Sequence, residues 1–476
     1  MMLTKEYINE LKTAGNGALS EVIEKLKDAS SIIFLLENLG HLPKGFDGNL
    51  LIPLLNFKNS QVKFWTVKNL GKLEDVRCLE ILSKIAREDN DSMVRREAIS
   101  SIGRMRNPQN KSVLIEFLND SDPKVVLQAM RGLLVYKNTD KTVDNSLKKL
   151  INHPNEMIQT VIHKEYFSNN LNKITQPHAQ TYNFLKNVVV NTDVREVLKF
   201  VPDESIHLTF TSPPYYNARD YSIYQSYKEY LDFLVEIFKD VHRVTKEGRF
   251  FILNTSPIII PRISRQHSSK RYPIPFDIHH YLIDMGWEFI DDIVWLKSES
   301  SVKNRNAGFL QHRKPLGYKP NPVTEYLMVY RKETDKLLDW NIHQYNWNIV
   351  KESKVIEDYE TSNVWKIDPT FNKVHSAVFP VELCNRVIKF YSFKGDLVFD
   401  PFAGSGTLGR AAKSLERYFF LTEQDKRYFE EIKNNLSNMS LFANKEPLFL
   451  SLEQFKEVSK NDTARISSKE YYPKTY

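Results

Sequence analysis

The sequence has few of the features that would place it outside the cytosol. It contains only 2 cysteines in 476 residues, Cys78 and Cys384, and neither lies in a Cys-x-x-Cys spacing. We therefore expect no zinc site or other bound metal and no disulfide framework. No apolar run reaches the ~18–20 residues needed to span a bilayer, and residues 1–6 lack a signal-peptide pattern. These absences predict a cytoplasmic protein with no membrane partner.

The chain also lacks a strong excess of either charge. Its 66 Lys and Arg residues against 59 Asp and Glu residues give a net charge of +7, which permits nucleic-acid binding without requiring it. Hydrophobic residues make up 41% of the sequence, which is enough for packed cores. A chain of this length is expected to form more than one domain.

Residues 1–175 contain few strand signals and instead repeat a helical phrase. Equivalent positions of the phrase are 32, 31 and 32 residues apart and are Val62, Val94, Val125 and Met157. An Asn or Asp precedes each phrase, as expected of a helix N-cap; these residues are Asn59, Asp91, Asp122 and Asn155. The period is typical of a solenoid of helix pairs, whose stacking creates the core. The pattern resembles HEAT-like repeats.

The second helix of the predicted pairs is rich in basic residues. These are Lys63, Lys68, Arg95, Arg96, Lys124 and Arg131. Such a face is compatible with DNA contacts, with recruitment of a protein partner, or with a charged surface that meets only solvent. We expect residues 1–170 to add DNA contacts or to recruit a partner, and the sequence alone does not choose between them.

Two segments far apart in the chain follow short apolar runs that are typical of buried strands. The first is Thr-Ser-Pro-Pro-Tyr at residues 211–215, after the run 205–210. The second is Asp-Pro-Phe-Ala-Gly-Ser-Gly-Thr at residues 400–407, after the run 396–399. In parallel α/β sheets, ligands bind where strands end and loops begin. We therefore predict one pocket with two occupants, one against each loop.

The glycine-rich segment indicates a site for an adenosine-bearing cofactor. Gly404 and Gly406 allow positive φ and a close approach of the backbone to a ligand. A phosphate-binding P-loop would continue with Gly-Lys, and no Lys follows Gly406. Glu423 ends a second apolar strand about 20 residues downstream, where an acid binds a ribose hydroxyl in dinucleotide-binding units. A nicotinamide cofactor and S-adenosylmethionine both fit this pattern.

The proline-rich segment predicts a rigid hook for a planar base. Pro213 and Pro214 fix φ and supply no N–H, and Ser212 is held extended by the proline that follows it. The Ser212 hydroxyl and the Pro213 carbonyl can accept the two hydrogens of an exocyclic amino group, which aims the nitrogen lone pair at an electrophile. Tyr215 offers a ring for stacking, which is worth roughly 1–3 kcal/mol per base in single-strand binders.

Together these motifs resemble a β-group DNA amino-methyltransferase, in which the base motif precedes the cofactor motif. The similarity covers residues 180–435 and includes the segments 291–297, 325–330 and 375–383. It implies an α/β Rossmann-like methyltransferase sheet, S-adenosylmethionine as cofactor and double-stranded DNA as substrate. It assigns cofactor contacts to Asp193, Phe379, Pro380, Asp400, Phe402, Gly404, Gly406, Thr407 and Glu423. One departure is Thr192 before Asp193, where the family often has Gly.

The resemblance also favours a particular target atom. Ser-Pro-Pro-Tyr is associated mainly with cytosine N4, whereas Asp-Pro-Pro-Tyr and Asn-Pro-Pro-Tyr are more usual for adenine N6. Neither cysteine follows a proline, so the Pro-Cys nucleophile of cytosine C5 methylation is missing. We expect N4 methylation of a flipped-out cytosine, in a restriction-modification or defence setting.

Four alternatives remain at this point. The first is the same chemistry at adenine N6, and the second is an RNA or protein amino-methyltransferase. The third is a non-catalytic nucleic-acid-binding or assembly protein built on the helical repeats. A nicotinamide dehydrogenase is disfavoured because the substrate loop offers no acid or base for hydride transfer.

The sequence predicts a HEAT-like domain at residues 1–175, a methyltransferase domain at 176–440 and a tail at 441–476. A recognition region is expected at roughly residues 300–365, with Trp340 and Trp347 in the core rather than stacked on bases. Basic segments free of acids, residues 261–272 and 300–320, are candidate DNA contacts because phosphates require positive charge.

Overall fold

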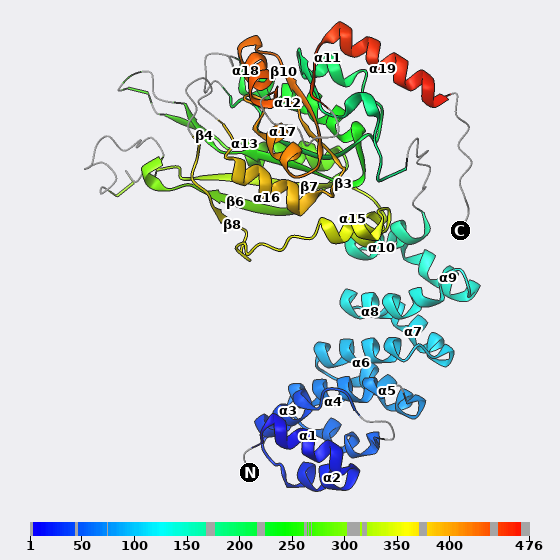
Figure 1. The fold of residues 1–476 in the computed structure, drawn as a ribbon. Helices are drawn as coiled ribbons and strands as arrows, with labels where there is room; N and C mark the ends of the chain where they lie inside the picture. Colours follow the sequence, from blue (N-terminus) through cyan, green and yellow to red (C-terminus); the bar gives the residue numbers. More distant parts are fainter. Residues whose placement is uncertain are drawn as a thin grey trace. The chain divides into compact units, whose positions relative to one another are not determined.

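The chain forms two compact units, residues 1–171 and residues 172–476, which are described separately (Figure 1). The computed structural model describes residues 3–42, 46–73, 75–167, 177–216, 224–260, 264, 266–267, 269–301, 315–316, 321–370, 378–437 and 446–467. Within these ranges, no helix combines the length and the apolar character that a membrane crossing requires.

The described residues of the first unit form helices and no strand. Its α-helices are α1 (Lys5–Ala14), α2 (Asn16–Lys25), α3 (Ala29–Asn38), α4 (Ser60–Lys72), α5 (Leu79–Glu88), α6 (Ser92–Arg104), α7 (Lys111–Glu116), α8 (Pro123–Leu133), α9 (Lys141–Lys148) and α10 (Glu156–Tyr166). Helices α4, α6 and α8 form one layer, and α5, α7 and α9 lie along the other side (Figure 1). The predicted N-caps are confirmed, because the side chains of Asn59, Asp91, Asp122 and Asn155 accept N–H groups at the starts of α4, α6, α8 and α10.

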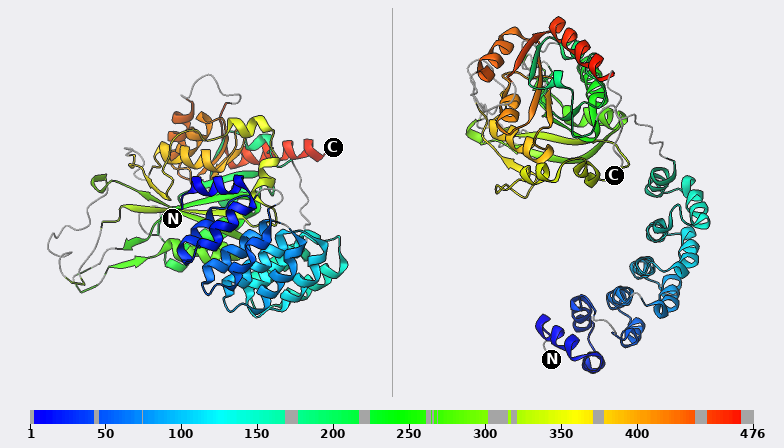
Figure 2. Two further views of the ribbon diagram at one scale, coloured as in Figure 1. Left: turned by 90° about the horizontal axis from the view of Figure 1, so that it is seen from below. Right: turned by 45° about the vertical axis from the view of Figure 1, so that its right-hand side comes forward.

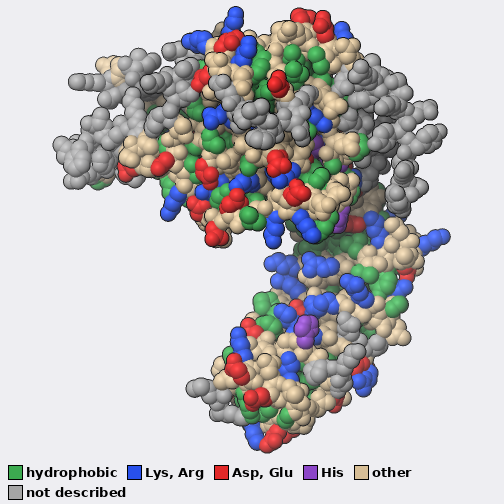
Figure 3. Space-filling view, viewed as in Figure 1, with side chains coloured by type: hydrophobic (Ala, Val, Ile, Leu, Met, Phe, Trp, Pro, Cys, Tyr) green, Lys and Arg blue, Asp and Glu red, His purple; other side chains and the backbone are tan. Residues whose placement is uncertain are grey.

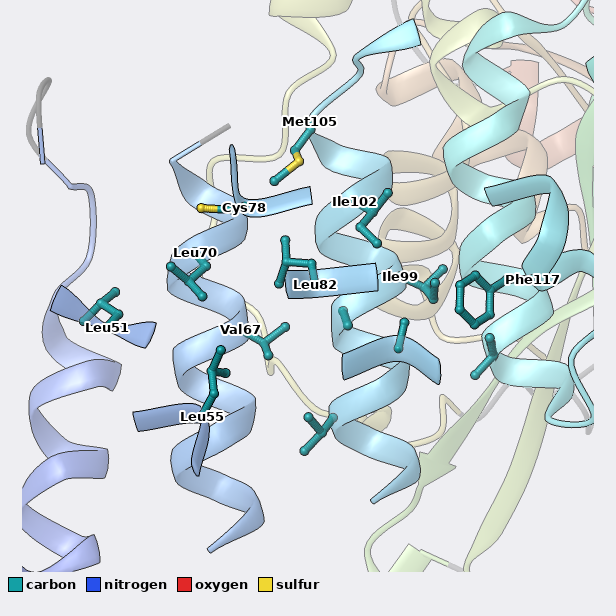
Figure 4. Packing of buried hydrophobic residues seen from close by; sticks show 14 of the residues in the cluster. Leu51, Leu55, Val67, Leu70, Cys78, Leu82, Ile99, Ile102, Met105 and Phe117 are labelled. Atoms are coloured by element: carbon teal, nitrogen blue, oxygen red, sulfur yellow. The ribbon is translucent and has the colours of Figure 1, made fainter. Parts of the chain in front are cut away.

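The core of this unit lies between the two helix layers. Figure 4 shows Leu70, Leu82 and Ile99 directed into this space from three successive helices. The repeat valines at 62, 94 and 125 are fully buried. In the fourth phrase the buried position is shifted by one residue. Ile158 is buried there, and Met157 is 59% exposed.

The second unit is built on a nine-stranded sheet of order β11-β1-β10-β9-β2-β3-β7-β6-β8. The strands are β1 (Val188–Asn191), β2 (Ile206–Thr211), β3 (Thr245–Thr255), β6 (Trp287–Leu296), β7 (Thr324–Lys332), β8 (Val364–Lys366), β9 (Leu397–Asp400), β10 (Tyr418–Glu423) and β11 (Leu448–Ser451). The six strands from β11 to β3 run parallel, and β7 is antiparallel to both β3 and β6. A separate hairpin pairs β4 (Ile258–Ile260) with β5 (Lys270–Tyr272).

Helices cover both faces of the sheet (Figure 2). The helices are α11 (Val194–Leu198), α12 (Tyr227–Val244), α13 (Ile274–Asp284), α14 (Leu338–His343), α15 (Trp347–Glu352), α16 (Val381–Tyr391), α17 (Thr407–Ser414), α18 (Lys426–Ser437) and α19 (Leu452–Ser467). One face packs against α11, α12, α13 and α19, and the other against α16, α17 and α18. Because helices cover both faces of the sheet, every residue of β2 and of β9 is buried.

A buried polar network holds the amino ends of the central strands. The guanidinium of Arg249 forms an ion pair with Asp396, whose Oδ1 accepts the Tyr345 hydroxyl at 2.6 Å. His207 accepts the Leu397 N–H at Nδ1, 3.0 Å away. Burial lowers the pKa of His207 well below its ordinary value, which keeps the ring neutral and able to accept this bond. The network fixes how β2, β3 and β9 begin.

The predicted recognition region is divided between the two ends of the sheet. Tyr345 follows α14 and reaches Asp396, so this part lies at the amino ends of the central strands. Trp340 is half-buried, its ring 5.1 Å from that of His178. The prediction of a core position is wrong for Trp347, which is 65% exposed. Residues 302–314 and 317–320 lie outside the described residues.

Close packing in the helical unit generates a stability prediction. A Cβ added to Gly103 would lie 3.0 Å from the Cα of Gly132, a backbone atom that cannot move independently. Gly103→Val should therefore lower the free energy of unfolding by ~1–3 kcal/mol through overpacking. Urea unfolding followed by circular dichroism measures it. Gly17→Ala is the control, because nothing lies within 4 Å of an added Cβ there; equal stability of the two variants would contradict the prediction.

Candidate active site

The structure brings the two predicted loops together at the carboxyl ends of adjacent parallel strands. Thr211, the last residue of β2, donates its hydroxyl hydrogen to Oδ1 of Asp400, the last residue of β9, at 2.6 Å. Strand β9 lies between β10 and β2 in the sheet. After β9 the chain continues to β10 on one side, whereas after β2 it continues to β3 on the other side. Ligands of open α/β sheets bind at such a reversal of strand order.

The glycine-rich loop is held by backbone hydrogen bonds and two positive φ angles. Gly404 and Gly406 have φ of 53° and 76°. The Gly404 N–H donates to Oε2 of Glu423 at 2.9 Å, and the Gly406 N–H donates to the Ala403 carbonyl at 2.8 Å. Thr407 begins α17, with its Oγ1 3.2 Å from the Ser405 hydroxyl. The loop therefore turns sharply over the edge of the sheet and enters the helix.

Two buried acids stand beside this loop. Burial raises the pKa of Asp400 to about 7, although hydrogen bonds from Thr211 and from the Phe402 N–H oppose the shift. Burial likewise raises the pKa of Glu423 to about 7. Its second oxygen, Oε1, accepts the Asp425 N–H at 2.8 Å. A cationic ligand beside these groups would favour their ionised forms.

The predicted base-binding segment, residues 212–215, is called the base loop, and it follows β2 directly. Pro213 is buried, and Ser212 and Pro214 are half-buried. Tyr215 packs partly against the core below and donates its hydroxyl hydrogen to Oε2 of Glu325 at 3.1 Å. Burial, followed by the nearby Glu325 carboxylate, raises the pKa of Tyr215 well above its ordinary value. The hydroxyl is therefore a neutral donor at physiological pH.

Glu325 is the residue that sequence reasoning missed. It belongs to β7 and forms a second bond, an ion pair with Lys297 just beyond the end of β6. The ammonium of Lys297 also lies 4.3 Å from the centroid of the Trp295 ring. The sequence contains only a weak signal for this pair, namely an acidic residue and a Lys near the ends of two predicted strands. Glu325 and Lys297 meet because the register of β6 and β7 pairs Trp295 with Glu325.

The remaining predicted residues lie along the same edge. Phe379 stacks on Phe210 of β2 with ring centroids 4.6 Å apart, and the buried Pro380 precedes α16. Phe402 is half-buried beside the loop. Residues 371–377, part of the segment expected to line the cofactor, lie outside the described residues.

Asp193 has a structural role of its own. It caps α11 by accepting the Arg195 N–H at 2.9 Å, and it pairs with the Arg195 guanidinium at 2.7 Å. Burial opposes ionisation, but these bonds lower the pKa of the carboxyl. Arg195 therefore already uses part of the hydrogen-bond acceptor capacity of the Asp193 carboxylate, and only the remainder is available to a ligand. Across the described part of the chain, no group of three or more His, Cys, Asp and Glu side chains could hold a metal ion.

Comparisons with known proteins match two parts of the chain to known families. The family described as DNA methylase (N6_N4_Mtase) matches residues 206–434, and the HEAT repeat family matches residues 79–162. The chain is 29% identical over 255 residues to the Type II beta methyltransferase M.BslI of Bacillus sp. (strain NEB-606), covering 51% of this chain and 26% of that protein. It is 28% identical to the Type II methyltransferase M.MwoI of Methanothermobacter wolfeii, covering 52% and 34%.

The chain thus spans only about a quarter to a third of these two relatives. It is 27% identical to the orphan methyltransferase M.BamHII of Bacillus amyloliquefaciens, covering 50% of this chain and 91% of that one. A solved putative DNA modification methylase from Thermus thermophilus, complexed with S-adenosyl-L-methionine, is 23% identical, with a TM-score of 0.43 over 56% of this chain and 99% of that one. Residues 206–434 are thus similar to N6/N4 DNA methylases, and residues 79–162 are similar to HEAT repeats.

Proposed function

We propose that this chain transfers a methyl group from S-adenosylmethionine to the exocyclic N4 amino group of cytosine in double-stranded DNA. The observation that carries the proposal is the hydrogen bond between Thr211 and Asp400, which joins the base loop to the glycine-rich loop. Adenine N6 is the alternative target. The match of residues 206–434 to the N6/N4 family supports both targets equally, and the Ser-Pro-Pro-Tyr form of the base loop favours cytosine.

The residues at the glycine-rich loop fit this cofactor. When bound, S-adenosylmethionine supplies an electrophilic methyl group carried on a sulfonium cation. Two buried carboxyls with raised pKa values, Asp400 and Glu423, favour such a cationic, hydroxyl-bearing ligand. Glu423 would accept hydrogen bonds from the ribose, and Gly404 and Gly406 leave room for the backbone to approach it. The other proposed contacts are Asp193 with the adenine, Phe379 and Pro380 with the methionine end, and Phe402 and Thr407 along the loop.

The base loop would orient the acceptor nitrogen. The Ser212 hydroxyl and the Pro213 carbonyl accept the two amino hydrogens, which reduces conjugation of the nitrogen lone pair with the ring. Tyr215 stacks on the base, and its bond to Glu325 restricts rotation of the ring. Pro214 stiffens the hook between them. The chain's own residues thus hold the nitrogen in one direction and exclude alternative poses.

A base inside a duplex cannot reach this pocket, so the target must be flipped out at a cost of a few kcal/mol. Contacts to phosphates would offset this cost. Lys270 and Arg271 on β5 are exposed and belong to one of the predicted basic segments. The hairpin that carries them follows β3, whose carboxyl end lies at the same edge of the sheet as the two loops. We propose that this hairpin contacts the DNA backbone.

The relatives named as Type II methyltransferases support a restriction-modification setting, with the cytoplasm as the place of action on DNA. The test of the reaction is mass spectrometry of methylated nucleosides in genomic DNA from cells expressing the chain. We expect N4-methylcytosine with the wild type and its loss with Ser212→Ala. N6-methyladenine would instead establish the alternative target, and neither mark from folded protein would refute DNA methylation by this chain alone.

Two substitutions of Tyr215 distinguish the contribution of base stacking from that of the hydroxyl hydrogen bond. Tyr215→Ala should lower the methylation rate by roughly 5- to 150-fold, the equivalent of ~1–3 kcal/mol of base stacking. Tyr215→Phe keeps the ring and removes the hydroxyl with its bond to Glu325, so a smaller decrease of about 2- to 10-fold is expected. Single-turnover methylation of a duplex oligonucleotide measures both, with cofactor binding as the control. Equal activity of the Ala variant and the wild type would exclude the stacking role.

Glu423 generates a pH dependence of stability. The unfolded chain releases the Glu423 proton near pH 4.5, whereas burial raises the native pKa to about 7. Between these values the native state binds more protons, so the free energy of unfolding falls as pH rises, by up to ~3 kcal/mol. Urea unfolding of wild type and Glu423→Gln at about pH 5 and about pH 7 should show a smaller decrease in the variant. Identical decreases would show that Glu423 is ionised throughout.

A further inference from the structure

The helix layer formed by α4, α6 and α8 has an unbalanced charge. These helices carry three, three and two basic residues, and their single acidic residue is Glu97. The opposite layer, α5, α7 and α9, carries five basic and four acidic residues. Lys and Arg side chains gather on the visible face of the helical unit in Figure 3. The positive charge is therefore concentrated on one side of the repeats.

Part of this charge stabilises the stacking of repeats. Lys63 pairs with Asp89 at 2.8 Å and Arg96 pairs with Asp122 at 2.8 Å, each joining one repeat to the next. Arg104 pairs with Glu97 in its own helix at 2.6 Å. The remaining lysines and arginines of the layer have no carboxylate partner among the described residues; they are Lys68, Lys72, Arg95, Lys124 and Arg131.

Small residues bring the ends of these helices close together. Gly103 in α6 and Gly132 in α8 approach so closely that a Cβ on either would lie about 3 Å from the other's Cα. Arg104 and Arg131 are their direct neighbours in sequence. In α4, Gly71 packs in the same way against Ser101 of α6, which places Lys72 beside this line. Packing of the backbones thus brings close together the helix segments that carry Lys72, Arg104 and Arg131.

The Lys72 ammonium bonds to neutral oxygens rather than to a carboxylate. Its Nζ donates to the Gly40 carbonyl and to Oδ1 of Asn69, both at 3.0 Å. Burial, followed by repulsion from Lys68, Arg104 and Lys12, lowers the pKa of Lys72. Neutral carbonyl and amide oxygens only partly offset this repulsion. An anionic ligand would remove it.

We propose that this cationic face, defined by Lys68, Lys72, Lys124 and Arg131, binds the phosphate backbone of duplex DNA. Packed helices lie about 8–10 Å apart, so three of them span roughly 20 Å, the axial length of about six base pairs. The choice of DNA as the polyanion rests on the proposed function, in which DNA is the substrate. The binding is independent of sequence and of methyl transfer, and it would hold the chain on DNA between encounters with target sites.

The test compares two full-length variants with matched loss of charge. The first combines Lys68→Gln, Lys72→Gln, Lys124→Gln and Arg131→Gln. The control combines Lys27→Gln, Lys84→Gln, Lys141→Gln and Lys149→Gln, at exposed positions outside this layer. Fluorescence anisotropy with a labelled duplex that lacks any methylation measures Kd over a range of salt concentrations. The first variant should bind at least ~10-fold more weakly at low salt, and its slope of log K against log salt should be smaller by about 0.9 for each phosphate that is no longer neutralised.

Equal affinity and slope for the two variants would overturn the proposal. The double variant Lys124→Gln, Arg131→Gln, which changes only exposed residues, guards against misfolding and should reduce the slope by up to about 2. If DNA binding is unchanged while binding of a polyglutamate probe is abolished, the face takes an acidic protein and the DNA proposal is wrong. Ser212→Ala should leave the slope unaltered, so failure of the proposed reaction is distinguishable from failure of this inference.

Discussion

The site depends on the parallel pairing of β2 with β9. These strands come from parts of the chain almost 190 residues apart, and their pairing places the base loop and the glycine-rich loop at one edge of the sheet. The bond from Thr211 to Asp400 closes this edge, and it leaves a buried carboxyl whose pKa is raised by its surroundings. Without this pairing the two motifs would be two unrelated turns.

The opposite end of the same strands is held by a different kind of interaction. Arg249, Asp396 and Tyr345 form a buried network in which the positive and negative charges are paired and hydrogen-bonded. Breaking such a pair is costly because a single charge would remain buried. The network ties the segment after α14 to β3 and to the start of β9, so part of the predicted recognition region also supports the sheet. The carboxyl ends of the same strands carry the two loops of the candidate site.

The helical unit follows a different logic, because its core comes from repetition. A period of about 32 residues was visible in the sequence through its valines and its N-cap residues, and the structure places both as expected. The same period did not indicate how the basic residues are used. Lys63 and Arg96 bond to acids of the next repeat, which can be known only when the repeats are stacked. The charge that remains after this pairing distinguishes the α4, α6 and α8 layer from the other.

Local chemistry in the sequence was sufficient to predict the buried strands, the positive-φ glycines of the turn and the strand that ends at Glu423. Each depends on backbone conformation or on hydrophobic patterning over a few residues. Only the tertiary structure decided that Glu325 holds the Tyr215 hydroxyl, that Asp193 is shared with Arg195, and that Trp347 is exposed. These outcomes depend on strand register and on contacts between distant segments. A sequence does not contain them in any local pattern, because side chains far apart in the chain meet only after the sheet and its helices have packed.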